Sequence, residues 1–247
     1  SSDLPPEAIR AFCEAIGVTK FDSLTDPALL DHCIREVLNR TAPRAMAVFD
    51  PLPVTLENPE DLPASVQALN NPEDPEGGGT REVPFAADLF IEREDFAEIP
   101  PPKFKRLVPG GSVRLRHAGF LTCTAVEKDG AGRVTGLRGR FSPMDAAVKV
   151  KATIHWVARE SAQKAEVRLY ERLFTVPEPC ADKERDYKEF FNGDSEKTAT
   201  AFVEPSLASA EPASRFQFER IGYFVLDKDS RPGAPVFNRI ATLKDSK

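Results

Sequence analysis

The stretch Ser-Val-Arg-Leu-Arg-His-Ala-Gly-Phe at residues 112–120 decides the fold class of this chain. Apolar Val113 and Leu115 alternate with basic Arg114 and Arg116, and a period of two indicates a β-strand with one buried and one solvated face. The pattern recurs on both sides of this stretch. We predict strands at residues 46–49, 54–57, 83–92, 112–126, 134–141, 147–157, 166–174, 200–203, 216–226 and 236–243. Short strands separated by turn residues are typical of antiparallel barrels or a sandwich.

Residues before Ala42 follow a helical period instead. One apolar stripe formed by Ile9, Phe12, Cys13 and Ile16 predicts a helix that stops at Gly17. A second helix begins at the N-cap Asp26 and at Pro27, and its predicted inward side chains are Leu29, Leu30, Cys33, Ile34, Val37 and Leu38. Two helices alone bury little surface, so we expect them to rest on the barrels or on another domain. Residues 57–81 are rich in Pro, Asn, Glu and Gly, which predicts a long surface loop, and a short helix is predicted at 182–191.

The composition describes a globular chain without a membrane segment. Of its 247 residues 41% are hydrophobic and 29% are charged, and the sequence contains no long apolar run. The four cysteines are scattered and form no C-x-x-C pair, so we predict reduced thiols and neither a disulfide framework nor a metal site. These features predict a cytoplasmic protein.

Charge is distributed unevenly along the chain. The net charge is −6, yet residues 101–151 contain eleven bases against three acids and carry +8, which leaves −14 elsewhere. Such a segment can attract RNA locally while the remaining surface repels it. Two other interpretations stay open: an ordinary solvated face, or a protein-interaction β-module that binds an acidic partner.

The sequence indicates RNA binding more strongly than catalysis. It contains no Gly-rich phosphate loop, no G-x-S-x-G and no H-E-x-x-H, and the three histidines lie far from any evident partner. Acid pairs such as Glu92 and Glu94 are predicted to be solvated. Arg114 and Arg116 on one strand face could contact bases or phosphates bidentately. At residues 148–156 a similar alternation places Lys149 and Lys151 opposite a buried face.

Several separate stretches of the sequence, all in the right order, resemble the C-terminal half of the glutaminyl-tRNA synthetases. They are Ala-Pro-Arg-Ala-Met-Ala-Val at 42–48, Lys-Arg-Leu-Val at 105–108, Val-Arg-Leu-Arg at 113–116, Ile-His-Trp-Val at 154–157, Val-Arg-Leu-Tyr at 167–170, Phe-Gln-Phe-Glu-Arg at 216–220, Gly-Tyr-Phe at 222–224 and Pro-Val-Phe-Asn-Arg at 235–239. The resemblance extends over essentially the whole chain.

The resemblance implies a mainly β fold of two antiparallel barrels, similar to a ribosomal 5S-RNA-binding protein, preceded by a short α-helical segment. Residues 1–41 would form the helical connector to a catalytic Rossmann domain. Residues 42–247 would form the anticodon-binding region, with a distal barrel at roughly 85–155 and a proximal barrel at roughly 42–84 plus 156–247. In that family the catalytic domain attaches glutamine to tRNA(Gln) with ATP and Mg. Its signature motifs are absent here, so we expect no cofactor in this chain, no activity from it alone, and a monomer.

The resemblance also implies roles for individual residues. Arg44 and Gln217 match positions that contact the central anticodon base, and Asn70 is a weaker match for the same base. Arg106 and Arg220 match positions near the third base, and Arg114 and Arg116 match the pocket for the first base. Lys103, Lys105, Lys149 and Lys151 are weaker candidates for the RNA backbone. Because a period of two would put Gln217 and Arg220 on opposite faces of one strand, we expect a bulge or twist near Gly222.

The sequence departs from the family pattern in its loops, and one related family remains an alternative. The 70–80 stretch has an additional glycine-rich tip and the turn at 142–145 is short. The archaeal and eukaryotic type of glutamyl-tRNA synthetase shares these barrels. The Phe-Gln-Phe-Glu-Arg and Gly-Tyr-Phe stretches favour the glutaminyl family.

Overall fold

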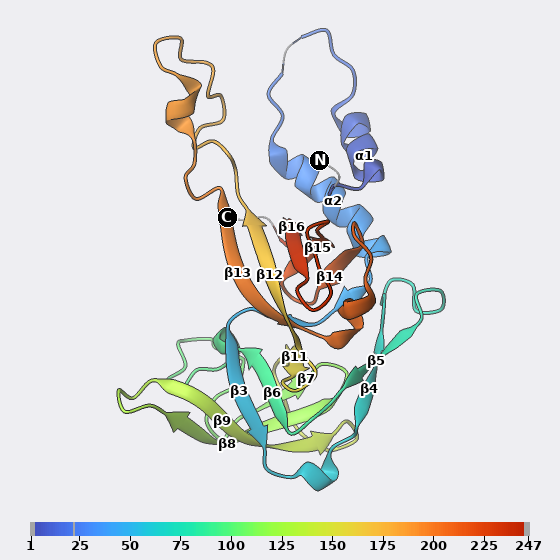
Figure 1. Cartoon of the computed structure of the whole chain (residues 1–247), viewed down its shortest axis with the longest axis vertical. Helices are drawn as coiled ribbons and strands as arrows, with labels where there is room; N and C mark the ends of the chain where they lie inside the picture. The colour runs from blue at the N-terminus through green and yellow to red at the C-terminus, as the bar shows by residue number, and fades with distance from the viewer. Residues whose placement is uncertain (1–2, 22, 245–247) are drawn as a thin grey trace.

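A computed structural model of the chain describes residues 3–21 and 23–244 (Figure 1). Within these residues the α-helices are α1 (Pro6–Ile16) and α2 (Pro27–Thr41). The strands are β1 (Arg44–Ala45), β2 (Ala47–Val48), β3 (Pro51–Leu56), β4 (Ser65–Leu69), β5 (Thr80–Pro84), β6 (Asp88–Glu92), β7 (Ser112–Leu115), β8 (Gly119–Lys128), β9 (Val134–Pro143), β10 (Thr153–Ile154), β11 (Trp156–Ala158), β12 (Gln163–Tyr170), β13 (Glu196–Val203), β14 (Arg215–Phe218), β15 (Gly222–Leu226) and β16 (Val236–Thr242). Single 3-10 turns are η1 (Pro59–Asp61), η2 (Arg93–Asp95), η3 (Tyr187–Phe190) and η4 (Pro205–Ser209).

The proximal sheet, which adjoins the helices, has the strand order β1-β14-β15-β16-β12-β13-β2. Its two edge strands are consecutive in sequence, since only Met46 separates β1 from β2. A sheet whose opposite edges are one residue apart must curve round into a nearly closed barrel. At this corner the N–H of Met46 donates to the carboxylate of Glu204 at 2.9 Å, and the Met46 carbonyl accepts the backbone N–H of Glu204 at 3.1 Å, so both buried backbone groups are satisfied.

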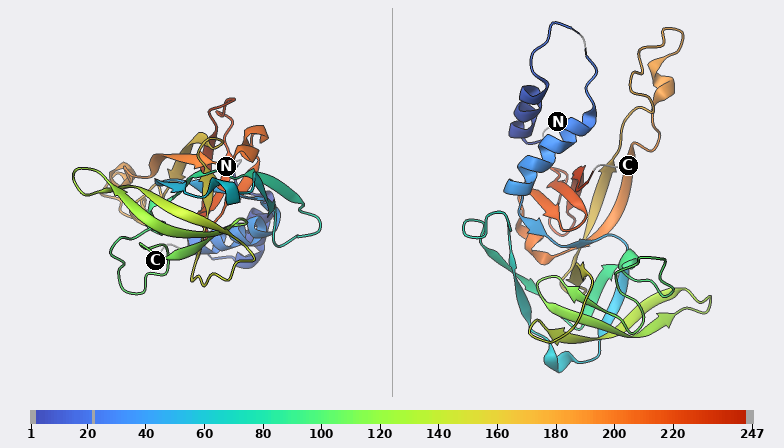
Figure 2. Two further views of the ribbon diagram at one scale, coloured as in Figure 1. Left: turned by 90° about the horizontal axis from the view of Figure 1, so that it is seen from below. Right: turned by 180° about the vertical axis from the view of Figure 1, so that it is seen from behind.

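The distal sheet closes in the same way. Its order is β10-β7-β8-β9-β3-β6-β11, and its edge strands β10 and β11 are separated only by His155. The two barrels lie one above the other along the long axis of the molecule (Figure 1), and Figure 2 shows the same two layers from behind. The predicted mainly β, two-barrel architecture is confirmed. Among the described strands, four pairs are parallel: β1/β14, β7/β10, β12/β16 and β3/β9.

Two predicted strands are hairpins. Residues 112–126 fold into β7 and β8 with a turn at His117, whose φ is 63°. Residues 216–226 fold into β14 and β15 with a turn at Arg220, whose φ is 69°. Gln217 and Arg220 therefore do not share one strand, so the bulge or twist expected near Gly222 is not needed to bring them to one side. The β15/β16 register does shift between Tyr223 and Phe224.

Other boundaries also differ from the prediction. The predicted loop at 57–81 contains β4 and the start of β5, which pair as a hairpin, and residues 147–152 are irregular before β10. The predicted helix at 182–191 is the single turn η3 with a capping box from Asp186. Strand β3 pairs with β6 and β9, so it belongs to the distal sheet and not, as predicted, to the proximal barrel. Strand β11 pairs with β6 and is distal for the same reason.

The helices pack at the end of the proximal barrel. The Asp26 side chain accepts the N–H of Ala28 at 2.9 Å, as predicted for an N-cap. Four predicted inward residues of α2 (Cys33, Ile34, Val37, Leu38) are buried, and Ile34 and Leu38 belong to a core cluster with Tyr223 and Ala241. In α1 the predicted apolar stripe is not buried, since Ile9 and Ile16 are exposed. In the described part of the chain, neither helix has the length and apolar character needed to cross a membrane.

Candidate nucleic-acid interface

The β14–β15 turn brings the candidate residues together. Each of the three residue pairs that the resemblance assigns to anticodon bases has one member that lies in the segment Gln217–Arg220 or binds to it. We call this segment the turn segment. Gln217 lies opposite Arg44 in the parallel β1/β14 ladder. Glu219 forms an ion pair with Arg116. Arg220 shares the carboxylate of Asp95 with Arg106. Residues far apart in sequence therefore converge on four consecutive positions.

Arg44 is buried and holds the end of α2. Its guanidinium donates to the carbonyl oxygens of Ala42 at 2.8 Å and Asn39 at 3.0 Å, and to Oδ1 of Asn39 at 2.9 Å. A cation that binds the last carbonyls of a helix is favoured there by the helix dipole. Burial lowers the pKa of Arg44, an effect that the nearby Tyr223 and Glu219 oppose.

Asn70 and Gln217 flank Arg44. The backbone N–H of Arg44 donates to the Asn70 carbonyl at 2.6 Å, and the Asn70 side chain donates to the Gly78 carbonyl at 3.0 Å. Gln217 has a buried Oε1 atom with no hydrogen-bond partner among the residues that the structure describes. A buried acceptor without a partner is costly. Because protein atoms cover this oxygen, a ligand would use it only after neighbouring side chains move.

Arg116 occupies the β7–β8 turn with a fixed backbone. Its N–H donates to the Ile154 carbonyl at 2.9 Å, and its carbonyl accepts the indole N–H of buried Trp156 at 2.9 Å. Its side chain pairs with Glu219, which also lies 3.0 Å from Nε2 of His117. Burial alone would raise the pKa of Glu219, but the hydrogen bond with His117 and the charge of Arg116 outweigh burial and lower it.

Arg114 is the most accessible of the candidate arginines. It lies on β7 between buried Val113 and Leu115, as the alternation predicts, and is itself exposed. Its guanidinium carbon lies 5.5 Å from the centre of the Phe120 ring, a cation–π distance. No ion-pair partner for Arg114 is found within residues 3–21 and 23–244. The side chain is therefore available to an external anion or base.

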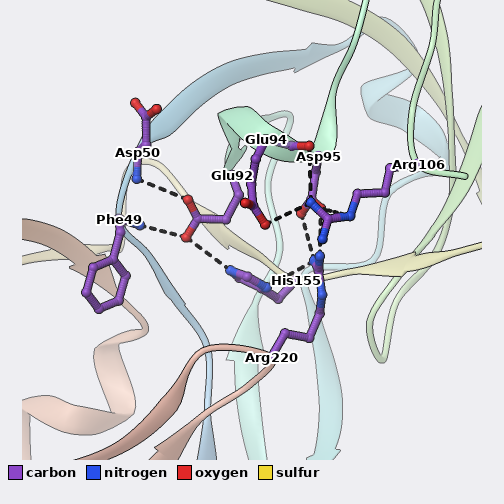
Figure 3. Close-up of polar contacts among 8 residues, drawn as sticks. All are labelled: Phe49, Asp50, Glu92, Glu94, Asp95, Arg106, His155 and Arg220. Atoms are coloured by element: carbon purple, nitrogen blue, oxygen red, sulfur yellow. Dashed lines mark hydrogen bonds and ion pairs between the residues drawn. The ribbon is translucent and has the colours of Figure 1, made fainter. Parts of the chain in front are cut away.

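Arg106 and Arg220 meet at a buried acid between the sheets (Figure 3). Arg220 donates to both oxygens of Asp95 at 2.7 Å, and Nε of Arg106 lies 3.2 Å from Oδ1 of the same residue. Arg106 also donates to Glu94 at 2.8 Å. Burial would lower the pKa of Arg220, but the bonds to Asp95 outweigh it and raise the pKa.

Glu92 and His155 extend this network, against the prediction that they are solvated and isolated. Glu92 accepts the backbone N–H groups of Phe49 at 2.8 Å and Asp50 at 3.0 Å, and lies 3.4 Å from His155. The other ring nitrogen of His155 lies 3.3 Å from Arg220. Burial would raise the pKa of Glu92, but the bonds from His155 and the two amides lower it. Through these bonds Glu92 holds the connection between β2 and β3 in place.

The candidate lysines lie outside this network. Lys103, with a φ of 68°, and Lys105 are exposed in the connection before β7. Lys149 and Lys151 are exposed in the irregular segment before β10, while Val148, Val150 and Ala152 between and around them are partly buried. The predicted alternation of exposure therefore holds without the predicted strand.

Sequence reasoning missed the acids that organise the interface. Asp95 is 0% exposed and Glu219 is 3% exposed, yet both lie in charged stretches, Glu-Arg-Glu-Asp at 92–95 and Phe-Glu-Arg at 218–220, that read as solvated. The sequence did contain a signal, because apolar residues adjoin the acids of each stretch. Phe90 and Ile91 precede the first stretch, and Phe218 begins the second. A short charged run between buried strands can enter a core when arginines neutralise it.

Comparison with known proteins assigns the family. Residues 42–142 and 153–227 each match a family model described as the anticodon-binding domain of class I tRNA synthetases (E and Q). The chain is 48% identical to a glutamine–tRNA ligase of Xanthomonas euvesicatoria pv. vesicatoria over 98% of its length and 43% of that relative. It is 49% identical to a glutamine–tRNA ligase of Rhodopirellula baltica, over 98% of the chain and 41% of the relative. The chain thus spans less than half the length of these relatives. It belongs to the class I tRNA synthetases for glutamate and glutamine, as an anticodon-binding portion of the glutamine–tRNA ligase type.

Proposed function

We propose that this chain reads the anticodon loop of a glutamine tRNA. In the complete protein it would act in the cytoplasm beside a catalytic domain that uses ATP and Mg to attach glutamine to that tRNA. The observation that carries the proposal is the convergence of Arg44, Arg116 and Arg106 on the turn segment. Each of three anticodon bases would meet its own cluster, which is how proteins recognise unstacked RNA bases.

The chemistry of the three clusters supports this assignment. The unpartnered Oε1 of Gln217 offers an acceptor to the central base once neighbouring side chains move. Arg114, which stays exposed, offers a guanidinium to the first base. Arg106 and Arg220 are held by Asp95 with side chains 36% and 23% exposed, and we assign them to the third base. The exposed lysines would contact phosphates, which position the RNA without reading sequence.

The test is the affinity of the 247-residue chain for a glutamine tRNA transcript and for transcripts altered at one anticodon base, measured across a salt series. A lost base contact should weaken binding by about 1–3 kcal/mol. Phosphate contacts weaken with salt for every transcript equally, so a preference that persists at high salt identifies base reading. A glutamate tRNA transcript is the matched control, because it tests whether the chain has the specificity of the related glutamyl-tRNA synthetases instead. Equal affinity for all transcripts at every salt concentration would refute the proposal.

A further inference from the structure

Asp95 is a fully buried carboxylate between the two sheets. It ends η2 on the distal side, and its side chain is 0% exposed. A buried charge is unfavourable unless it is paired and hydrogen bonded. Both requirements are met by arginines, since Arg220 binds both oxygens and Arg106 binds Oδ1. Arg106 also binds the exposed carboxylate of Glu94 at 2.8 Å, so Asp95 is the buried acid that both arginines share.

The shared oxygen fixes the two guanidiniums relative to each other. Arg106 comes from the distal side, and Arg220 comes from the proximal β14–β15 turn, where its φ of 69° directs the side chain toward Asp95. Oδ1 of Asp95 lies 2.7 Å from Arg220 and 3.2 Å from Arg106. Without this acid two like charges would face one another and repel. Their spacing thus depends on a residue that solvent does not reach.

The exposed fractions of the three side chains show which of them RNA could contact and which could only orient the others. A guanidinium has five N–H donors, and the two oxygens of Asp95 occupy only some of them. Arg106 and Arg220 keep exposed side-chain fractions of 36% and 23%, against 0% for Asp95. The cations can therefore be approached from outside while the anion stays inside. Its part is to orient donors, not to touch RNA.

We propose that Asp95 is the positioning residue for recognition of the third anticodon base, and that this recognition needs both sheets because one arginine comes from each. The inference rests on the proposed function, which assigns Arg106 and Arg220 to that base. It makes a distinctive prediction about charge. Removing Asp95 removes a negative charge, so overall attraction to RNA should be kept or increased while selectivity at one base is lost.

The experiment measures dissociation constants of the chain and of Asp95→Asn for the cognate transcript and for transcripts altered at the first, the central or the third anticodon base. The asparagine amide keeps the shape but cannot neutralise two guanidiniums. We expect the discrimination ratio at the third base to fall about tenfold, with the ratios at the other bases unchanged. Asp95→Glu keeps the charge and should fold even if Asp95→Asn does not. Its longer side chain displaces the arginines, so it should lose part of the same ratio.

Phe202→Leu is the matched control. Phe202 of β13 and Phe90 of β6 pack across the same sheet-to-sheet interface at a ring distance of 4.7 Å, and among the described residues neither ring makes a cation–π contact with Arg106 or Arg220. If this variant loses the third-base ratio equally, or if the Asp95 variants lose all ratios equally, Asp95 is only structural and the inference is overturned. Retention of the third-base ratio in both Asp95 variants also overturns it. If the unaltered chain shows no discrimination at any base, the proposed function itself fails.

Discussion

At the scale of single residues, the candidate interface is organised by acids that hold arginines. Glu219 and Asp95 are buried. Glu219 pairs with Arg116 of the β7–β8 turn, and Asp95 binds Arg106 and Arg220, which come from different elements. Arg114 is the exception, because among the described residues its guanidinium contacts the Phe120 ring and has no paired acid. The arginines therefore differ in how far each supports the structure and how far each can bind a ligand. Substitutions should distinguish the structural role from the ligand-binding role.

Arg114→Ala should change RNA binding without changing stability. The side chain is exposed, so its removal creates no cavity and leaves no buried group unpaired. We expect a loss of about 1–3 kcal/mol in binding of the cognate transcript and a smaller preference at the first anticodon base. Arg133→Ala, which removes another exposed arginine (82% exposed) on the distal sheet side, is the control. An equal loss for all transcripts would reassign Arg114 to phosphate binding.

Glu219→Gln should remove a pH-dependent part of the stability. Because the pKa of Glu219 is lower in the folded chain than its usual value, ionisation of this residue favours the folded state. That contribution is complete above the unfolded pKa of about 4.3 and disappears as the pH falls through the lower folded pKa. Urea unfolding at several pH values should therefore show a deficit for the variant at pH 7 that shrinks below about pH 4. A deficit that is constant with pH would contradict this role.

At the scale of elements, a buried ion pair helps to attach the β4–β5 hairpin to the proximal barrel. Arg81 of β5 donates to both carboxylate oxygens of Glu204, at 2.5 and 3.1 Å, and Glu204 is 1% exposed. The tip of the same hairpin carries Asn70, which accepts the backbone N–H of Arg44. The hairpin therefore spans from the distal sheet to the candidate site.

Arg81→Ala should destabilise the chain and release the hairpin. Removing one partner of a buried pair costs about 3–5 kcal/mol, because the other charge stays buried. Hydrogen exchange at residues 65–84 and protease cleavage at residues 70–79 should both increase. Arg185→Ala, which breaks an ion pair between side chains about half exposed, should cost under about 1 kcal/mol. Unchanged exchange in the hairpin would show that strand pairing alone holds it.

The elements also show what the sequence can predict. Strands with clear alternation, such as 112–115 and 134–141, are found where the period of two placed them. The turns at His117 and Arg220 were missed because neither position holds the Gly or Asn that usually marks a positive φ. The β4–β5 hairpin was missed because its polar composition resembles a loop. Its register is set by pairing and by Glu204, which are tertiary contacts.

For the candidate site, individual arginines could be predicted but their pairings could not. The resemblance supplied the arginines, but nothing local in the sequence linked Arg106 to Arg220, 114 positions apart. Their meeting depends on Asp95 at the contact between two barrels. Likewise, the capping of α2 by Arg44 depends on where the helix ends against β1. Pairings of this kind follow from packing, which periodicity does not describe.

At the scale of the whole molecule, the two barrels are joined by two chain crossings and a buried ionic network. The chain passes from β2 to β3 beside Glu92 and returns from β11 to β12. The contact between the sheets also includes the Phe90–Phe202 ring pair. Neither barrel can separate from the other without exposing Asp95 and these apolar rings.

We therefore expect the barrels to unfold together. Thermal unfolding followed by far-ultraviolet and near-ultraviolet circular dichroism should give one transition with the same midpoint for both signals. Asp95→Ala leaves two guanidiniums without their shared anion, so it should lower that midpoint or split the transition. Two resolved transitions in the unaltered chain would show that the interface is too weak to couple the barrels.

The crossings have a consequence for how such a chain could arise. The distal sheet, from β3 to β11, is one continuous insertion into the proximal sheet. Val48 and Gln163 at its two ends both flank β13, opposite Phe202 and Val203, so they are about 10 Å apart at two strand spacings. Three or four residues span that gap. Excision of residues 50–162 would keep every proximal strand and also Phe49, which packs on Phe218 and Phe224. A gene could thus acquire the second barrel in one insertion event without interrupting any strand of the first.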